Sequence, residues 1–260
     1  DIDAATLHGV LVMNTPEANT LAATEQTMAL MLALCRHLPA ANASVKRSEW
    51  TRSKFLGTQL SDKVLGVIGL GRIGSRVATR CQAFGMKVIA YDPYIAEEVA
   101  ERLHVQLVGD LDELLTCADL ITVHTPLTAE TNGMIGAAEI GKMKDRVLLI
   151  NCARGGIYDE QSLLDGLRSG KIAGAAIDVY SEEPPKTDRL KQLLALDNVV
   201  ATPHIGANTV EAQRDVAVQI VQQVIDALRH DQLPFGAQHG GDGILAARVG
   251  RQVQRTRACG

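Results

Sequence analysis

Arg154, Glu183 and His204 carry side chains whose chemistry is complementary. A guanidinium can hold a planar carboxylate through two hydrogen bonds, and an imidazole can give or take a proton near neutral pH. A carboxylate beside that imidazole can fix its orientation. Taken singly, the three residues are better explained by structural roles: a surface ion pair for Arg154, a solvated turn for Glu183 and a helix cap for His204. If they converge in the fold, they supply the clamp, the orienting group and the acid of a catalytic site.

Each of these residues follows a predicted strand. From Lys63 onward, short β-branched runs alternate with helical stretches, a pattern typical of βαβ units. We therefore predict an α/β fold, a Rossmann-type doubly wound parallel sheet. Ligands of such sheets bind outside the carboxyl ends of the strands, so one crevice should receive all three side chains. The expected strands are Lys63–Ile68, Lys87–Tyr91, Leu120–His124, Arg146–Asn151, Ile172–Val179 and Asn198–Thr202, and the helices between them include Ile73–Phe84, Leu111–Cys117, Asp159–Arg168 and Arg189–Leu194.

A glycine-rich turn follows the first of these strands. Gly69, Gly71 and Gly74 have the GxGxxG spacing that permits a tight turn, a close approach of pyrophosphate and close helix–strand packing. The motif alone is weak, and its place between a strand and a helix strengthens it. Asp92 ends the next strand, where its carboxylate would bind a ribose 2′-hydroxyl and repel a 2′-phosphate. The sequence therefore predicts NAD rather than NADP, with a structural Asp-Pro turn as the alternative for Asp92.

With NAD in the crevice, the three strand-end residues suit hydride transfer between the cofactor and a 2-hydroxy or 2-keto acid. In the reductive direction His204 would protonate the carbonyl oxygen. Arg154 would bind the substrate carboxylate and stabilise the charge that develops in the transition state. Glu183 would orient His204.

Composition excludes several other classes of protein. The net charge of −4 gives no basic surface for nucleic acid, and the longest apolar run, Met28–Cys35, is too short to span a membrane. Five cysteines without a CxxC pair suit reduced cytoplasmic thiols and predict no metal site. The chain starts at Asp1 without a signal segment, so we expect an internal piece of a longer protein.

Two further helices flank the predicted sheet. Leu21–Leu38 is apolar on nearly every face, which indicates either a central core helix or a helix covered on one side by a second subunit. Asn208–His230 is amphipathic, with Val210 and Leu228 among the residues expected to face inward. The segment Gly236–Gly260 shows no periodicity, and we expect it to be disordered or unrelated to the rest.

The motifs together resemble the D-2-hydroxyacid dehydrogenases, most closely the branch that acts on phosphoglycerate, from Asp1 to about Leu233. The resemblance implies NAD as cofactor, oxidation of 3-phosphoglycerate to 3-phosphohydroxypyruvate in serine biosynthesis, and Arg154, Glu183 and His204 as catalytic residues. The matching motifs are Gly9–Pro16, Gly69–Gly74, Val123–Leu127, Asn151–Asp159, Gly174–Pro185 and Pro203–Ala207. The cofactor contacts that it implies are Gly69, Gly71, Arg72, Ile73, Gly74, Asp92, Thr125, Cys152, Ala153, Arg154, Asp178, His204, Ile205, Gly206 and Ala207.

The resemblance also implies a domain organisation. Residues 1–15 would be a remnant, a helix end and a strand, of a flavodoxin-like substrate domain. Residues 16–207 would form the NAD-binding domain, with a dimerisation arm at about 17–50, and 208–235 a helix returning toward the substrate domain. Residues 236–260 would be the unrelated tail. A homodimer or homotetramer is expected.

Three alternatives stay open at this point. The chain could come from another D-2-hydroxyacid dehydrogenase, such as a glyoxylate/hydroxypyruvate reductase. It could be a truncated NAD-binding fragment with little activity, because half of the expected cleft is absent. It could also be an NAD-sensing scaffold.

Overall fold

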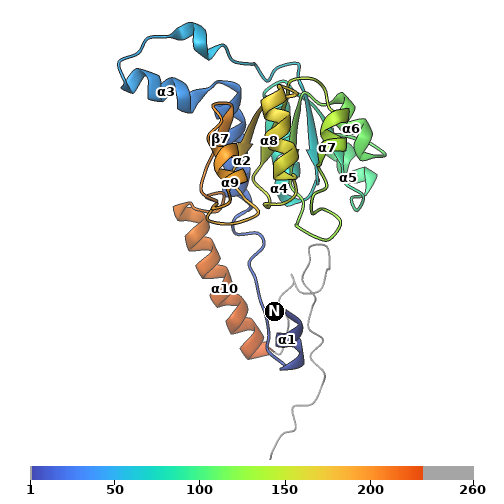
Figure 1. The fold of residues 1–260 in the computed structure, drawn as a ribbon. Helices are drawn as coiled ribbons and strands as arrows, with labels where there is room; N and C mark the ends of the chain where they lie inside the picture. The colour runs from blue at the N-terminus through green and yellow to red at the C-terminus, as the bar shows by residue number, and fades with distance from the viewer. Residues whose placement is uncertain (1, 231–260) are drawn as a thin grey trace, which may run out of the picture. The chain divides into compact units, whose positions relative to one another are not determined.

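The computed structural model describes residues 2–230, and the predicted tail 236–260 lies outside them. The chain divides into two compact units. One is Asn19–Gln213, and the other is formed by the chain on either side of it. The described part of the second unit contains α1 (Ile2–Leu7) and most of α10 (Val210–His230). The colour bar of Figure 1 locates both units along the chain.

A seven-stranded parallel sheet forms the centre of the larger unit. Its strand order reverses between β1 and β4, and a crevice for ligands forms at such a point. The order confirms the doubly wound parallel sheet predicted from the sequence. From one edge to the other, the strands are β3 (Gln106–Leu107), β2 (Lys87–Tyr91), β1 (Val64–Ile68), β4 (Leu120–Val123), β5 (Val147–Asn151), β6 (Ile172–Ile177) and β7 (Val199–Ala201).

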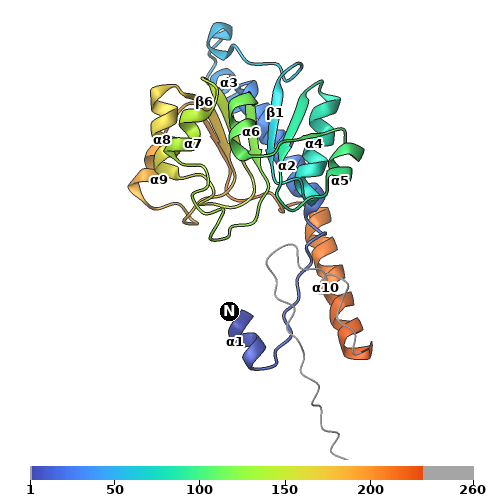
Figure 2. The same ribbon diagram turned by 90° about the vertical axis from the view of Figure 1, so that its right-hand side faces the viewer.

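Helices cover both faces of this sheet and bury the apolar strands from each side (Figure 2). On one face, Met31 and Val77 pack with Leu65 of β1. On the other face, Leu115 and Leu163 pack with Leu149 of β5. The first layer consists of α2 (Thr20–Cys35), α4 (Arg72–Ala83) and α5 (Glu97–Arg102), and the second of α6 (Leu111–Cys117), α7 (Ala137–Lys142), α8 (Glu160–Ser169) and α9 (Asp188–Leu194).

The single helix predicted at Leu21–Leu38 is wrong, because the structure contains two. Helix α2 ends at Cys35, His37 adopts a left-handed backbone with φ 52°, and α3 (Leu38–Lys46) begins after it. Pro39 lies in the first turn of α3, where its missing N–H costs nothing, whereas inside a longer helix it would break the hydrogen-bond pattern. Most of α2 is buried inside its own unit, as a central core helix would be, and Leu21 stays 52% exposed.

Other differences lie where the sequence signal is weakest. The strand expected within residues 1–15 is wrong: α1 is present, and residues 8–15 form no strand. The inward face expected for α10 is also wrong within the described residues, since Val210 and Leu228 are 83% and 82% exposed. Within residues 2–230, no helix has both the length and the apolarity to cross a bilayer.

Candidate functional site

The glycine loop joins β1 to α4 at the carboxyl edge of the sheet. Gly69 has φ +89°, a conformation that L side chains rarely adopt, and an added Cβ would lie 2.8 Å from the carbonyl oxygen of His124. A Cβ on Gly74 would overlap the carbonyl oxygen of Gly69, so strand and helix pack closely only with glycine there. Around Gly71, by contrast, a Cβ would meet open space. The loop therefore leaves room for a ligand beside Gly71.

Several features of this loop and its surroundings fit a dinucleotide. Helix α4 begins without a capping side chain and without an acidic residue in its first turn, so no side chain of the helix itself occupies its positive end. Two buried polar atoms nearby, Thr125 Oγ1 and His124 Nδ1, have no hydrogen-bond partner within the described residues. Burial lowers the pKa of His124 to about 4, so its ring is neutral and uses Nε2 with the Thr122 hydroxyl at 3.0 Å.

Asp92 ties the end of β2 to the glycine loop. Its Oδ2 accepts the backbone N–H of Leu70 at 2.8 Å, and its Oδ1 accepts that of Tyr94 at 3.0 Å. Each carboxylate oxygen has a further lone pair, so hydrogen-bonding capacity remains for a ribose hydroxyl. Asp92 therefore has a structural role, and that role leaves its predicted role open.

His204 and Glu183 form a hydrogen-bonded pair at another part of this edge. His204 Nδ1 lies 2.7 Å from Glu183 Oε2, and Glu183 Oε1 accepts the backbone N–H of Tyr180 at 3.1 Å. Partial burial alone would raise the pKa of Glu183. The hydrogen bonds from His204 and Tyr180, with the charges of His204 and Arg154, outweigh burial and lower it. Glu183 is therefore held as a carboxylate, and His204 keeps Nε2 available for proton transfer.

Asp178 anchors the loop that carries His204. Its fully buried carboxylate accepts hydrogen bonds from the Thr202 hydroxyl, from the Ile205 N–H at 3.0 Å and from the Gly206 N–H at 2.8 Å. A carboxylate has about four acceptor positions, so about one is left for a cofactor group. The loop it holds includes His204 itself, whose φ is 52°.

Arg154 follows β5 and is exposed. Its guanidinium donates to the carbonyl oxygen of Ala153 at 2.6 Å, while the Asn151 side chain bonds the backbone on both sides, at Ala153 N and Arg154 O. Its charge helps to lower the pKa of Glu183, and no hydrogen bond joins it to that pair within the described residues. Arg154 thus acts on Glu183 through its charge, while its guanidinium bonds the backbone carbonyl of Ala153.

Cys152, two residues before Arg154, is buried. Burial raises the pKa of its thiol to about 12, so the thiol stays protonated and is no nucleophile. The four cysteines of residues 2–230 form no disulfide. The other predicted contacts are distributed along the same edge: Arg72 and Ile73 open α4, Thr125 follows β4, and Ala207 follows the loop that Asp178 holds.

Sequence reasoning missed two residues that hold the site, Glu160 and Tyr180. Glu160 is only 7% exposed, and its carboxylate accepts the Ser181 N–H and hydroxyl at 2.8 and 2.7 Å. The Tyr180 hydroxyl donates to the carbonyl oxygen of Thr202 at 2.8 Å. An acid in the first turn of a helix is ordinary, and only the fold brings Glu160 to the loop that leads to Glu183.

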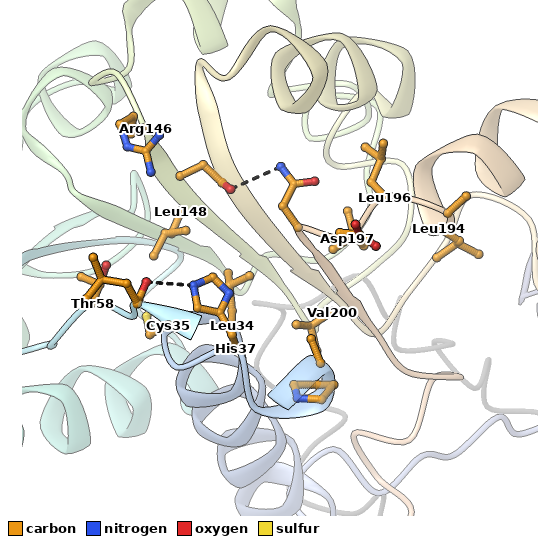
Figure 3. A pocket seen from close by; sticks show the side chains of 17 residues that line it. Leu34, Cys35, His37, Thr58, Arg146, Leu148, Leu194, Leu196, Asp197 and Val200 are labelled. Atoms are coloured by element: carbon orange, nitrogen blue, oxygen red, sulfur yellow. Dashed lines mark hydrogen bonds between the residues drawn. The ribbon is translucent and has the colours of Figure 1, made fainter. Parts of the chain in front are cut away.

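A cavity of about 320 Å³ lies away from these residues, against the amino ends of β5 and β6 (Figure 3). Leu34, His37, Arg146 and Val200 are among its lining residues. None of the candidate catalytic residues reaches it, so we do not assign the chemistry to it. No cluster of three or more potential metal ligands occurs within residues 2–230.

Comparison with known proteins identifies related chains. Residues 28–206 match the family model described as "D-isomer specific 2-hydroxyacid dehydrogenase, NAD binding domain". The D-3-phosphoglycerate dehydrogenase of Methanocaldococcus jannaschii is 51% identical over 229 residues, which are 88% of this chain and 43% of that protein. The chain spans less than half the length of the curated relatives that it matches.

Solved structures show the same fold at lower identity. A glyoxylate reductase from Paecilomyes thermophila superposes with a TM-score of 0.83 at 33% identity, covering 90% of this chain and 70% of that one. A D-lactate dehydrogenase from Aquifex aeolicus, complexed with NAD and lactic acid, gives 0.79 at 36% identity, covering 88% and 72%.

Proposed function

Because the chain belongs to the D-isomer specific 2-hydroxyacid dehydrogenase family, we propose that it binds NAD at the reversal of strand order between β1 and β4. We propose further that it supplies the acid–base pair and the anion clamp of an NAD-dependent oxidoreductase. The observation that carries this proposal is the 2.7 Å contact between His204 and Glu183, at the same sheet edge as the glycine loop.

In the oxidative direction, His204 takes the hydroxyl proton of a 2-hydroxy acid at Nε2 while Glu183 holds Nδ1. Glu183 thereby fixes the ring nitrogen that faces the reaction and stabilises the imidazolium that forms. Gly69, Gly71 and Gly74 of the glycine loop would hold NAD, which would supply the acceptor for the hydride on C2 of the substrate. Arg154 binds the substrate carboxylate after its guanidinium leaves the carbonyl of Ala153. Loss of the hydroxyl proton and of the C2 hydride would convert the 2-hydroxy acid to a 2-keto acid and leave the proton on His204.

We propose 3-phosphoglycerate as the substrate, which places the parent reaction in serine biosynthesis. The support is the 51% identity to a D-3-phosphoglycerate dehydrogenase, against 33% and 36% to the glyoxylate reductase and D-lactate dehydrogenase above. The four free thiols within residues 2–230 suit the cytoplasm, and we propose that compartment.

We also propose a homodimer formed through α3 and the residues around it. Leu38, Trp50 and Leu56 are 53%, 80% and 88% exposed, which is unusual for large apolar side chains so close together in the sequence. A second copy of the chain would bury them. Analytical ultracentrifugation measures the mass of the species in solution. A mass of two chains for the unaltered protein, and of one chain for a Trp50→Ser/Leu56→Ser variant, would support this interface.

The test of the proposed function uses the purified chain. Titration with NADH, followed by nucleotide fluorescence, should show saturable binding. Turnover of 3-phosphoglycerate with NAD should exceed turnover of D-lactate. Absence of NADH binding would refute the proposed function. Faster turnover of D-lactate would refute 3-phosphoglycerate as the substrate. Binding without turnover would show that these residues provide the cofactor half only.

A further inference from the structure

A hydrogen bond joins two loops whose strands are not neighbours. The Tyr94 hydroxyl donates to Glu130 Oε2 at 3.2 Å. Tyr94 follows β2 and Glu130 follows β4, and β1 lies between those strands. Adjacent strands lie about 4.8 Å apart, so this contact bridges a gap of about 10 Å across the carboxyl end of β1. The glycine loop starts at that end.

Both sides of the contact are anchored. The backbone N–H of Tyr94 is bound by Asp92 Oδ1 at 3.0 Å, so Tyr94 belongs to the turn of the ribose-binding candidate. On the other side, the Thr131 hydroxyl donates to the carbonyl oxygen of Pro126 at 2.6 Å, and the Gly133 N–H bonds Gly156 at 2.7 Å. The loop that presents Glu130 is therefore braced within itself and against the next loop.

The contact itself is open to solvent. Tyr94 is 84% exposed, so burial does not hold its ring. The charge of Glu130 and the hydrogen bond to it raise the pKa of Tyr94, which keeps the phenol as the donor. An exposed hydrogen bond of this kind is weak and can open and close readily. The loops after β2 and β4 are thus each held in place, and the hydrogen bond between Tyr94 and Glu130 that joins them can open and re-form.

We propose that Tyr94 and Glu130 form a clasp over the adenosine end of the cofactor groove, which opens for the dinucleotide to leave and slows its release when closed. The adenosine end follows from Asp92, whose carboxylate is placed for the ribose that carries the 2′-hydroxyl. The clasp rests on the proposed binding of NAD, and it assigns Tyr94 and Glu130 to cofactor retention.

The test measures release of NADH from the purified chain by stopped-flow fluorescence after displacement with excess NAD. Tyr94→Phe removes only the hydroxyl, and Glu130→Ala removes the acceptor. Each should speed release about two- to tenfold, the scale of one hydrogen bond. The double variant should release NADH no faster than the faster single variant, because both remove the same interaction. Glu130→Gln keeps an acceptor oxygen, so it should speed NADH release less than Glu130→Ala does.

Two controls separate the clasp from a general loosening. Glu97→Ala, another exposed acid after β2, should leave the release rate unchanged. Reduced nicotinamide mononucleotide lacks the adenosine half, and its release should be the same from all variants. Unchanged NADH release, additive single effects, or equal acceleration with the mononucleotide would overturn the clasp. If the unaltered chain fails to bind NADH, both the clasp and the proposed function are wrong. If it binds NADH and the variants release it at the same rate, only the clasp is wrong.

Discussion

Gly155 packs against the backbone of Tyr180 so closely that a Cβ at position 155 would overlap the Tyr180 carbonyl group and lie 2.5 Å from the nitrogen of Ser181. Gly155 belongs to the loop after β5 that presents Arg154, and Tyr180 to the loop after β6 that leads to Glu183. One close approach of backbones therefore sets the spacing between the loop that carries Arg154 and the loop that leads to Glu183. Glycine is the only residue that permits it.

We predict that Gly155→Ala destabilises the chain by about 1–3 kcal/mol, because backbone must move to admit the methyl group. Urea unfolding followed by circular dichroism measures the loss. The matched control is Gly109→Ala, where an added Cβ meets nothing within 4 Å and should change little. Equal stability of the two variants would contradict the close approach.

The sequence predicts local features well and distant pairings poorly. Leu120–His124 was predicted as a strand and β4 covers Leu120–Val123, because a β-branched run carries its own signal. Strand β3 has only two residues, which is too short for a period to be visible. The contact of Glu160 with Ser181 joins residues 21 apart, and that of Tyr94 with Glu130 joins residues 36 apart. Such contacts depend on crossovers that no local pattern encodes.

Removal of the buried carboxylate of Glu160 should destabilise the loop that precedes Glu183. Glu160→Ala leaves the Ser181 N–H and hydroxyl without their acceptor, a loss of about 1–3 kcal/mol measured by urea unfolding. Glu160→Gln keeps an acceptor oxygen and should lose less. If the two substitutions cost the same, the hydrogen bonds to Ser181 are not what Glu160 provides.

Asp159 caps the N-terminus of α8, and we expect its contribution to the stability of the chain to depend on pH. The Ser162 hydroxyl and backbone N–H bind its carboxylate and lower the pKa of Asp159. A folded pKa below the unfolded value means that the stabilisation is complete above about pH 3.9 and is lost as pH falls through the folded pKa. Asp159→Ala should therefore cost about 1 kcal/mol at pH 7 and progressively less below pH ~3.9. A constant difference between pH 7 and pH 3 would exclude this linkage.

Asp92→Ser should narrow the preference for NADH over NADPH, because the carboxylate that would repel a 2′-phosphate is gone. The ratio of the two dissociation constants, from fluorescence titration, is the measurement. Asp92 also accepts the Leu70 and Tyr94 N–H groups, so Asp92→Asn is the matched control that keeps an acceptor oxygen without the charge. An unchanged ratio in Asp92→Ser would count against the ribose role and leave the structural one.

His204→Gln should separate proton transfer from cofactor binding. The glutamine amide can still hydrogen-bond Glu183 but cannot carry the substrate proton, so turnover of 3-phosphoglycerate should fall by on the order of 10²-fold or more. NADH affinity should be retained, since the glycine loop and Asp92 lie on other strands. Glu183→Gln leaves the imidazole in place and removes only the charge that supports it, so its loss should be smaller. Turnover near that of the unaltered chain in His204→Gln would remove His204 from the proposed mechanism, whatever its distance from Glu183.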